Sequence, residues 1–459
     1  MRRAVIVLCC ILPALCGPAN AATKNVILMI SDGCGYNQIL ATDLYQYGSP
    51  GTQSYEKFPV RYAVSTYPGS TSHAPLGRGA KADCGYDPKL AWSEFDYVRH
   101  GFTDSAAAGT AMSCGIKTYN KAICKDLYGN DLRNITQLMK DTGRSAGVVT
   151  DVPWSHATPA CFAAHNVSRD NYADIAREMI DGNLDVIMGA GHPFFSDDGN
   201  PTTTAGTAKN NGVDVPGGYV GGLSAWRDLV TGSAGGRRPW TLIESRAQVV
   251  ALADGQTPHR VVGTVQAATT TQQSRSGPSF HTTLPYEASL NANEPTLIEL
   301  SRCALNVVDD NPKGFFLMIE GGAVDWACHT NQCARLIEEE TDFDRAVDSV
   351  IDWVNRRSSW DDTLLIVTAD HETGYLTGPG SGPIRQPMIT EIVGKGAGVM
   401  PEMQFNYWDH TNSLVPLFAK GSGSELFSQY ATHTDPVRGG YIDDTDIFRV
   451  MRDAAGIRE

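Results

Sequence analysis

Residues 315–329 read FFLMIEGGAVDWACH, and this stretch contains the two signals that decide the fold. Its first five residues form an uninterrupted apolar run, which is typical of a strand buried on both faces of a parallel sheet. Two acidic residues, Glu320 and Asp325, follow directly. Because ligands of open α/β sheets bind beyond the carboxyl ends of the strands, the stretch predicts an α/β protein whose functional residues follow its strands.

Four other apolar runs have the same character as residues 315–319, and helical patterns separate them. The clearest helical pattern covers residues 334–354, where apolar residues recur with a period near 3.6. We therefore predict a mostly parallel central sheet with helices on both faces. Its further strands are expected at residues 25–30, 146–150, 186–188 and 364–368.

Three segments rich in Gly, Pro, Thr and Ser interrupt this pattern, at residues 68–85, 197–236 and 375–403. No linker-like charge run separates them from the neighbouring strands and helices. We therefore expect surface insertions on a single domain that covers residues 22–459. Low-complexity disorder is the alternative for residues 202–211.

The composition limits the class of protein further. The chain has 459 residues, of which 42% are hydrophobic and 19% charged, which is enough apolar material for a large core. Its net charge is −14, and phosphate backbones are held by an excess of Lys and Arg, so nucleic acid is not expected as a stable partner. An anionic substrate would have to be attracted locally, by a metal ion or an arginine.

The first residues have the features of a signal peptide. Arg2 and Arg3 precede an apolar run over residues 4–16, and an A-x-A cleavage site follows at residues 19–21. We predict that residues 1–21 are removed and that the mature protein is exported, to the periplasm or the medium. No later segment approaches the ~20 apolar residues that a membrane span needs. A lipid anchor on Cys16 is the less favoured alternative, because Leu15 precedes it where a small residue is usual.

The cysteine count is compatible with disulfides in an exported protein. Eight cysteines lie beyond the predicted cleavage site, and counting alone does not give their connectivity. Two local pairs are the simplest candidates, Cys114 with Cys124 and Cys328 with Cys333. The others are Cys34, Cys84, Cys161 and Cys303.

Residues that can bind a metal ion follow several of the predicted strands. Asp325 and His329 are four residues apart, so on a helix both side chains would project from one face. Each signal alone has an ordinary alternative, such as a turn or a surface pair. Their coincidence at strand ends nevertheless predicts a site for Zn²⁺ or Mg²⁺. The other candidates are Asp32, His156, Thr158, Glu320, Asp370, His371 and His410.

Ser105 is the candidate nucleophile, in the sequence TDSAAAGTA at residues 103–111. The small residues after it favour a helix, and Thr103 or Asp104 can cap the start of that helix. Ser105 would then lie at a helix N-terminus, where free N–H groups favour an anion such as a phosphoryl group. The alternative is that Ser105 is an N-cap residue of a buried, alanine-rich helix.

Six motifs in this order resemble those of the alkaline phosphatases, over nearly all of the mature chain. A further segment, YIDDTDIFRVM at residues 441–451, is similar to the C-terminal part of that family. The six motifs are SDGCG at residues 31–35, TDSAAAGTA at 103–111, SHATPA at 155–160, EGGAVDWACH at 320–329, TADHETG at 368–374 and HTNSLVPLF at 410–418.

The resemblance implies hydrolysis of phosphate monoesters through a phosphoserine at Ser105. It also implies that the planar guanidinium of Arg169 binds two oxygens of the phosphoryl group. It also implies two Zn²⁺ and one Mg²⁺ per chain, and a homodimer. Asp325, His329 and His410 would hold one zinc, Asp32, Asp370 and His371 the other, and Asp32, Thr158 and Glu320 the magnesium.

Two positions depart from the best-known family pattern. His156 and Trp326 stand where many bacterial members have an Asp and a Lys beside the metals, a combination that resembles a marine and cold-adapted branch. His156 could hydrogen-bond a metal-bound water or bind a third zinc, and Trp326 could simply pack. Two other functions stay open: a superfamily relative that cleaves phosphodiesters or phosphonates, and a non-catalytic protein of the cell envelope that binds metal or phosphate.

Overall fold

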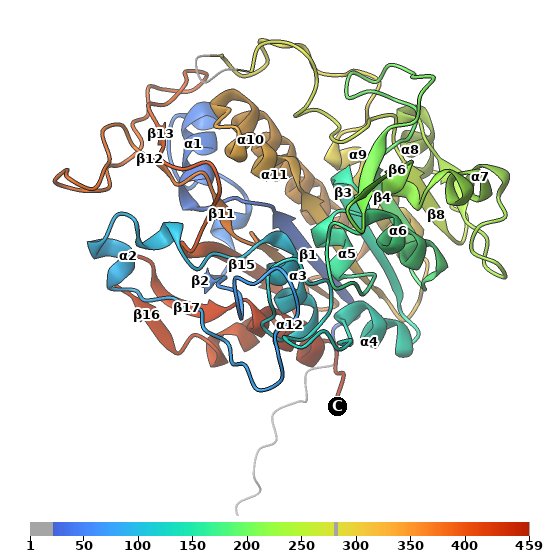
Figure 1. Cartoon of the computed structure of the whole chain (residues 1–459), viewed down its shortest axis with the longest axis horizontal. Helices are drawn as coiled ribbons and strands as arrows, with labels where there is room; N and C mark the ends of the chain where they lie inside the picture. Colours follow the sequence, from blue (N-terminus) through green and yellow to red (C-terminus); the bar gives the residue numbers. More distant parts are fainter. Residues whose placement is uncertain (1–21, 280–282, 459) are drawn as a thin grey trace, which may run out of the picture.

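The computed structural model describes residues 22–279 and 283–458, so the predicted signal peptide lies outside the described residues. A central sheet of eleven strands crosses the molecule (Figure 1). In spatial order its strands are β16 (His433–Asp435), β17 (Gly439–Asp443), β2 (Val60–Ser65), β15 (Val415–Gly421), β10 (Thr363–Thr368), β1 (Asn25–Ser31), β9 (Phe315–Gly321), β3 (Ser145–Pro153), β4 (Val186–Ala190), β8 (Val261–Thr264) and β7 (Thr241–Ile243).

The sheet is mostly parallel, as the sequence predicts. All neighbouring strands from β10 to β7 run parallel, and so do β17 and β2. Antiparallel pairing is confined to β15 with its two neighbours and to β16 with β17. The five predicted strands are β1, β3, β4, β9 and β10 in the middle of the sheet. They are buried almost throughout, which explains their continuous apolarity.

Helices pack in two groups on the sheet (Figure 1). One group contains α1 (Tyr36–Tyr47), α8 (Arg246–Ala253), α9 (Leu297–Val308), α10 (Ala323–His329) and α11 (Cys333–Arg357). The other contains α3 (Ser105–Cys114), α4 (Ile135–Asp141), α5 (Ala157–Cys161), α6 (Tyr172–Asp181) and α12 (Thr445–Ala454). The short α2 (Leu90–Ser93) and 3₁₀ turns η1 (Tyr55–Lys57), η2 (Tyr97–Arg99), η3 (Gly218–Val220) and η4 (Ser424–Gln429) lie in connections.

Helix α11 is the helix predicted at residues 334–354, extended by one residue at its start and three at its end. Its apolar residues, including Leu336, Phe343 and Val350, are buried, whereas its last turn carries the exposed Arg356 and Arg357. This division is what an amphipathic helix on the face of a sheet requires. Among the described residues, none of the helices is both long and apolar enough to cross a bilayer.

The three glycine-rich and proline-rich segments differ from one another. Residues 68–85 contain no helix or sheet strand, and residues 375–403 contain only β12 (Leu376–Thr377), which pairs with β13 (Gln404–Phe405). Residues 197–236 are more ordered than a plain loop. They form an antiparallel hairpin of β5 (Thr207–Asn210) and β6 (Val213–Pro216), followed by η3 and α7 (Leu223–Thr231).

The eight cysteines of the described residues are free thiols, so the structure does not contain the disulfides that their number allows. The thiol of Cys124 instead donates to the backbone oxygen of Cys161 at 2.8 Å, and the thiol of Cys114 lies 3.4 Å from the hydroxyl of Ser113. Cys328 is at the buried end of α10 and Cys333 begins α11, and they are not joined.

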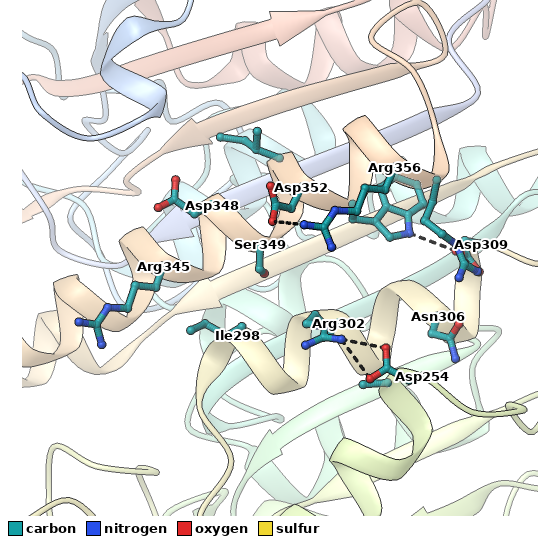
Figure 2. Close-up of a pocket in the computed structure, with 14 residues that line it drawn as sticks. Asp254, Ile298, Arg302, Asn306, Asp309, Arg345, Asp348, Ser349, Asp352 and Arg356 are labelled. Carbon is teal, nitrogen blue, oxygen red and sulfur yellow. Dashed lines mark hydrogen bonds and ion pairs between the residues drawn. The ribbon is translucent and has the colours of Figure 1, made fainter.

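A groove of about 760 Å³ lies between α9 and the second half of α11 (Figure 2). Three of its four arginines pair with aspartates, Arg302 with Asp254 at 2.8 Å, Arg356 with Asp352 at 3.3 Å and Arg357 with Asp309 at 3.2 Å, and its four aspartates balance its four arginines in charge. None of the candidate site residues lines it. Because its charges are compensated locally, the groove has no evident preference for an anionic ligand.

Candidate active site

Ser105 occupies the first position of α3. The side chain of Asp104 caps this helix by accepting a hydrogen bond from the N–H of Ala107 at 3.0 Å, as the sequence allows. Gly115 ends the helix with a φ of 73°, a left-handed conformation that glycine adopts without strain. Every residue of α3 is buried, and its small side chains let it pack closely against α5. The hydroxyl of Ser105 is therefore held by a fixed and enclosed helix terminus.

Two side chains from distant segments reach the hydroxyl of Ser105. Nε2 of His371 lies 3.2 Å from its Oγ, and Nη1 of Arg169 lies 3.4 Å from it. Arg169 also forms an ion pair with Asp104 at 3.1 Å. The serine is only 1% exposed, so its oxygen is enclosed next to a guanidinium that favours negative charge there.

The first candidate metal cluster contains Asp32, Asp370 and His371, whose potential ligand atoms all lie within 4.8 Å of one another. Asp32 follows β1, and the other two follow β10, the strand paired with β1. Nε2 of His371 is 3.2 Å from Asp370 and 3.5 Å from Asp32. The parallel register of two adjacent strands thus brings together residues that are more than 300 positions apart in sequence.

The second candidate cluster contains Asp325, His329 and His410. Nε2 of His329 is 3.0 Å from Nε2 of His410 and 3.3 Å from the carboxylate of Asp325, and His410 is 3.5 Å from that carboxylate. His410 belongs to β14 (His410–Thr411), a short strand that pairs with β11 (Glu372–Thr373) beside His371. The rings of His371 and His410 stack with centroids 3.6 Å apart, so the two clusters are contiguous.

Helix α10 orients Asp325 and His329 as the four-residue spacing predicts. It begins after Gly322, whose N–H donates to the carboxylate of Asp151 at 2.7 Å. A Cβ on Gly322 would come within 3.0 Å of both γ-carbons of Val152. The close approach of β3 to the start of α10 therefore requires glycine here.

Within the described part of the chain, four oxygen atoms of the candidate metal ligands are buried without a hydrogen-bond partner. They are Oδ1 of Asp32, Oδ2 of Asp370, Oγ1 of Thr158 and Oε1 of Glu320. Unpaired buried oxygens are costly and are usually satisfied, so a cluster of them at one sheet edge is suited to hold a cation. Three carboxylates and a hydroxyl also form the hard-oxygen donor set that Mg²⁺ prefers, and the imidazoles suit Zn²⁺. The residues present therefore fit the metals that the sequence predicts.

The pKa values of these carboxylates reflect their crowding. Burial, and then the neighbouring Asp370 and Asp325, raise the pKa of Asp32 well above its usual value. Burial and Asp325 raise the pKa of Asp370 to about 7, and burial raises that of Glu320 to about 8. Several carboxyl groups thus lie close together in one buried site. They can all be ionised at once only if positive charge beside them compensates their repulsion.

The pKa values of the imidazoles shift in two directions. Burial, and then His410, lower the pKa of His371 well below 6.5, and burial lowers that of His410. Although burial opposes it, the carboxylate of Asp325 raises the pKa of His329 to about 9. Neutral imidazoles with a free nitrogen are the form that binds a metal, so the two buried rings are in the ligating state.

His156 and Trp326 lie beside this site. Both nitrogens of His156 are within 3.5 Å of Nη2 of Arg169, and the ring stacks on Tyr172 with centroids 6.0 Å apart. Trp326 meets the edge of His156 at 5.6 Å. Burial and Arg169 lower the pKa of His156 to about 3, so this imidazole is neutral.

The structure adds residues that the sequence patterns miss. Asp409 forms a third cluster of potential ligands with His329 and His410, and its position directly before His410 is the signal that could have shown it. Thr373 donates to Asp325 at 2.5 Å, and Thr150 donates to Glu320 at 2.5 Å. Residues that hydrogen-bond metal ligands and orient them are recognised by their distance in the structure. They have no fixed spacing from the ligands in the sequence.

Comparison with known proteins identifies the family. The family model described as "Alkaline phosphatase" matches residues 23–415, and the chain belongs to this family. It is 30% identical over 366 residues to alkaline phosphatase 4 of Bacillus subtilis. The matched region covers 78% of this chain and 63% of that protein. It is 27% identical over 463 residues to the alkaline phosphatase of Escherichia coli, covering 96% of this chain and 88% of that protein.

The fold agrees with solved structures. The structure of alkaline phosphatase from the Antarctic bacterium TAB5 is similar with a TM-score of 0.63 and 24% identity, covering 96% of this chain and all of that chain. At this identity the likeness concerns the fold, and it agrees with the mostly parallel sheet described above.

Proposed function

We propose that this protein hydrolyses phosphate monoesters to an alcohol and inorganic phosphate, through a phosphoserine formed at Ser105. The observation that carries the proposal is the position of the Ser105 hydroxyl, between Arg169 and His371 and next to two clusters of carboxylates and imidazoles. Membership of the alkaline phosphatase family supports the same reaction.

Two zinc ions and one magnesium ion are the proposed cofactors. Asp325, His329 and His410 would hold one zinc, Asp32, Asp370 and His371 the other, and Asp32, Thr158 and Glu320 the magnesium. When bound, these ions would lower the pKa of the serine hydroxyl, stabilise the departing alkoxide and offset charge on the phosphoryl oxygens.

Arg169 is proposed to hold the phosphoryl group in place. Its guanidinium is anchored on one side by Asp104, and its two terminal nitrogens face Ser105 and His156. Although burial opposes it, Asp104 raises the pKa of Arg169, so the guanidinium stays charged at any working pH. A fixed, charged fork can donate to two oxygens of a phosphoryl group at once.

The chemistry then takes two displacements at phosphorus. Oγ of Ser105 bonds to phosphorus as the bond to the alcohol oxygen breaks, and water afterwards displaces the serine oxygen to release phosphate. The enclosed N-terminus of α3 directs its free N–H groups toward the phosphoserine. Two in-line displacements predict retention of configuration at phosphorus.

Replacement of the nucleophile tests the proposal. Ser105→Ala should lower kcat for an aryl phosphate by at least about a thousandfold, because the covalent step is lost. Ser113→Ala is the matched control, since Ser113 lies in the same helix and its hydroxyl forms hydrogen bonds with Thr110, Cys114 and Cys124. Mass spectrometry after an acid quench should find a phosphorylated peptide with Ser105 in the parent protein. Full activity of Ser105→Ala would refute the proposed nucleophile.

Metal content and substrate class complete the test. We expect elemental analysis to find about two zinc ions and up to one magnesium ion per chain, and activity to return with zinc after chelation. Bound metal with hydrolysis of diesters or phosphonates in place of monoesters would indicate the alternative superfamily function.

Export and assembly are further parts of the proposal. The A-x-A site before Ala22 supports cleavage of residues 1–21 and export of the mature chain. A homodimer is proposed from the family resemblance, and light scattering of the purified protein would measure its mass. N-terminal sequencing of the exported protein should begin at residue 22.

A further inference from the structure

A second cavity adjoins the candidate active site on the side of His329. It has a volume of about 440 Å³. The backbone oxygen of Trp408, one of its lining residues, accepts a hydrogen bond from Nδ1 of His329 at 2.8 Å. Asn331, two residues beyond His329, lines it as well. The cavity is therefore connected, through the backbone of Trp408, to the cluster that Asp325, His329 and His410 form.

Aromatic rings and an arginine make up the wall of this cavity. The guanidinium carbon of Arg99 lies 5.2 Å from the ring centroid of Phe95, 5.8 Å from that of Tyr375 and 5.4 Å from that of Tyr407. One of its nitrogens donates to the backbone oxygen of Asn406 at 2.5 Å. These contacts fix the side chains of the wall, so the cavity is already present before a ligand binds.

Trp408 is the unusual member of this wall. Its side chain is 64% exposed, although its backbone is fixed by His329. The centroids of the Trp408 and Tyr407 rings are 5.6 Å apart with an angle of 40° between the ring planes, and both residues line the cavity. Within residues 22–279 and 283–458, the indole N–H has no hydrogen-bond partner. An exposed ring on a fixed backbone at the rim of a cavity is suited to stack on a flat ligand.

We propose that this cavity receives the alcohol part of the substrate and that Trp408 favours esters whose alcohol carries a planar aromatic ring, such as aryl or nucleoside monophosphates. The inference rests on the proposed function, because it assumes a phosphoryl group between Ser105 and Arg169. An ester bound there would extend its alcohol past His329 toward Trp408. A small aliphatic alcohol would not reach the indole and would gain nothing from it.

The experiment compares three substrates and three variants. The substrates are phenyl phosphate, adenosine monophosphate and glycerol phosphate, and the variants are Trp408→Ala, Trp408→Phe and Tyr47→Ala. Tyr47, at the end of α1, is another exposed aromatic residue and serves as the matched control. For Trp408→Ala we expect kcat/KM to fall about three- to tenfold with the two aromatic esters and less than twofold with glycerol phosphate. Trp408→Phe should recover most of the loss.

Inhibition constants separate binding from chemistry. In Trp408→Ala the Ki of phenylphosphonate should rise about three- to tenfold, while those of methylphosphonate and inorganic phosphate should stay the same. Equal effects on all three esters, or no effect on any, would overturn the inference and leave the proposed function intact. A parent protein inactive on every ester would instead refute the proposed function.

The oligomeric state of Trp408→Ala provides one further test. If Trp408→Ala changes the mass of the particle in light scattering and leaves the preference among esters unchanged, the indole packs against a second copy of the chain. That result would also overturn the proposed role in substrate choice.

Discussion

Gly322, at the start of α10, allows a quantitative test of how this helix is positioned. In Gly322→Ala the new methyl would lie 2.8 Å and 3.0 Å from the two γ-carbons of Val152, and 3.2 Å from Cδ of Glu320. Val152 is fully buried and β-branched, so its side chain cannot rotate away easily. Such overpacking costs about 1–3 kcal/mol, and we expect a loss of about 2 kcal/mol in the free energy of unfolding.

Removing the opposing methyl groups should rescue the variant. Val152→Ala alone deletes two buried methyl groups and should cost about 2 kcal/mol. In the double variant the new methyl occupies part of the space that Val152 leaves. The two costs should therefore not add, and the coupling energy should be about 1–3 kcal/mol in the rescuing direction.

Equilibrium unfolding in urea, with saturating zinc and magnesium, measures all four proteins of this cycle. Activity should change in parallel, because α10 carries Asp325 and His329 and a shift of its start would displace both. Unchanged m-values would show that the denatured state is not affected. Additive costs, within about 0.5 kcal/mol, would refute the argument that these two side chains compete for one space.

Three further predictions follow from the charged groups. Arg169→Ala should raise the Ki of inorganic phosphate about a hundredfold in a competition assay, and an unchanged Ki would mean that Arg169 does not bind the substrate. Although burial opposes it, the hydrogen bond to Glu178 together with other neighbouring groups raises the pKa of His165 to about 9, so this pair stabilises the fold fully below pH 6.5 and less as the pH rises through 9. The melting temperature of His165→Gln should accordingly fall further below that of the parent at pH 6 than at pH 10, and an equal deficit would contradict the pairing. Chelation should lower the melting temperature at pH 8 because bound metal stabilises only the folded state, and no change would argue against a metal among Asp32, Asp370 and His371.

The central part of the fold could be predicted from the sequence because its signals are local. The strands β1, β3, β4, β9 and β10 are buried on both faces, so each is an apolar run that needs no knowledge of its neighbours. The edge strands gave no such signal. β16, β17 and β7 are short and partly exposed, and their pairing depends on tertiary contacts.

The candidate metal ligands could be predicted from the sequence, whereas the residues that contact and orient them could be predicted only in part. Asp32, Asp370 and His371 follow strands whose adjacency in the sheet makes them converge, and the motif order already indicated them. Thr373 contacts Asp325 through a distance that no spacing rule contains, whereas Asp409 stands directly before His410 and could have been noticed from that position. The free cysteines could not be predicted either. The number of thiols permits disulfides, and only the packing of the chain decides whether they form.

The position of β1 in the sheet has a consequence for how the chain acquires its structure. This strand ends at Ser31, yet its two neighbours, β9 and β10, begin at Phe315 and Thr363. During synthesis, some 280 residues must follow before β1 can make its first sheet hydrogen bond, and such non-local pairing is slow. This strongly apolar strand thus stays without its sheet partners for more than half of the synthesis, which makes the growing chain depend on chaperones or on delayed folding.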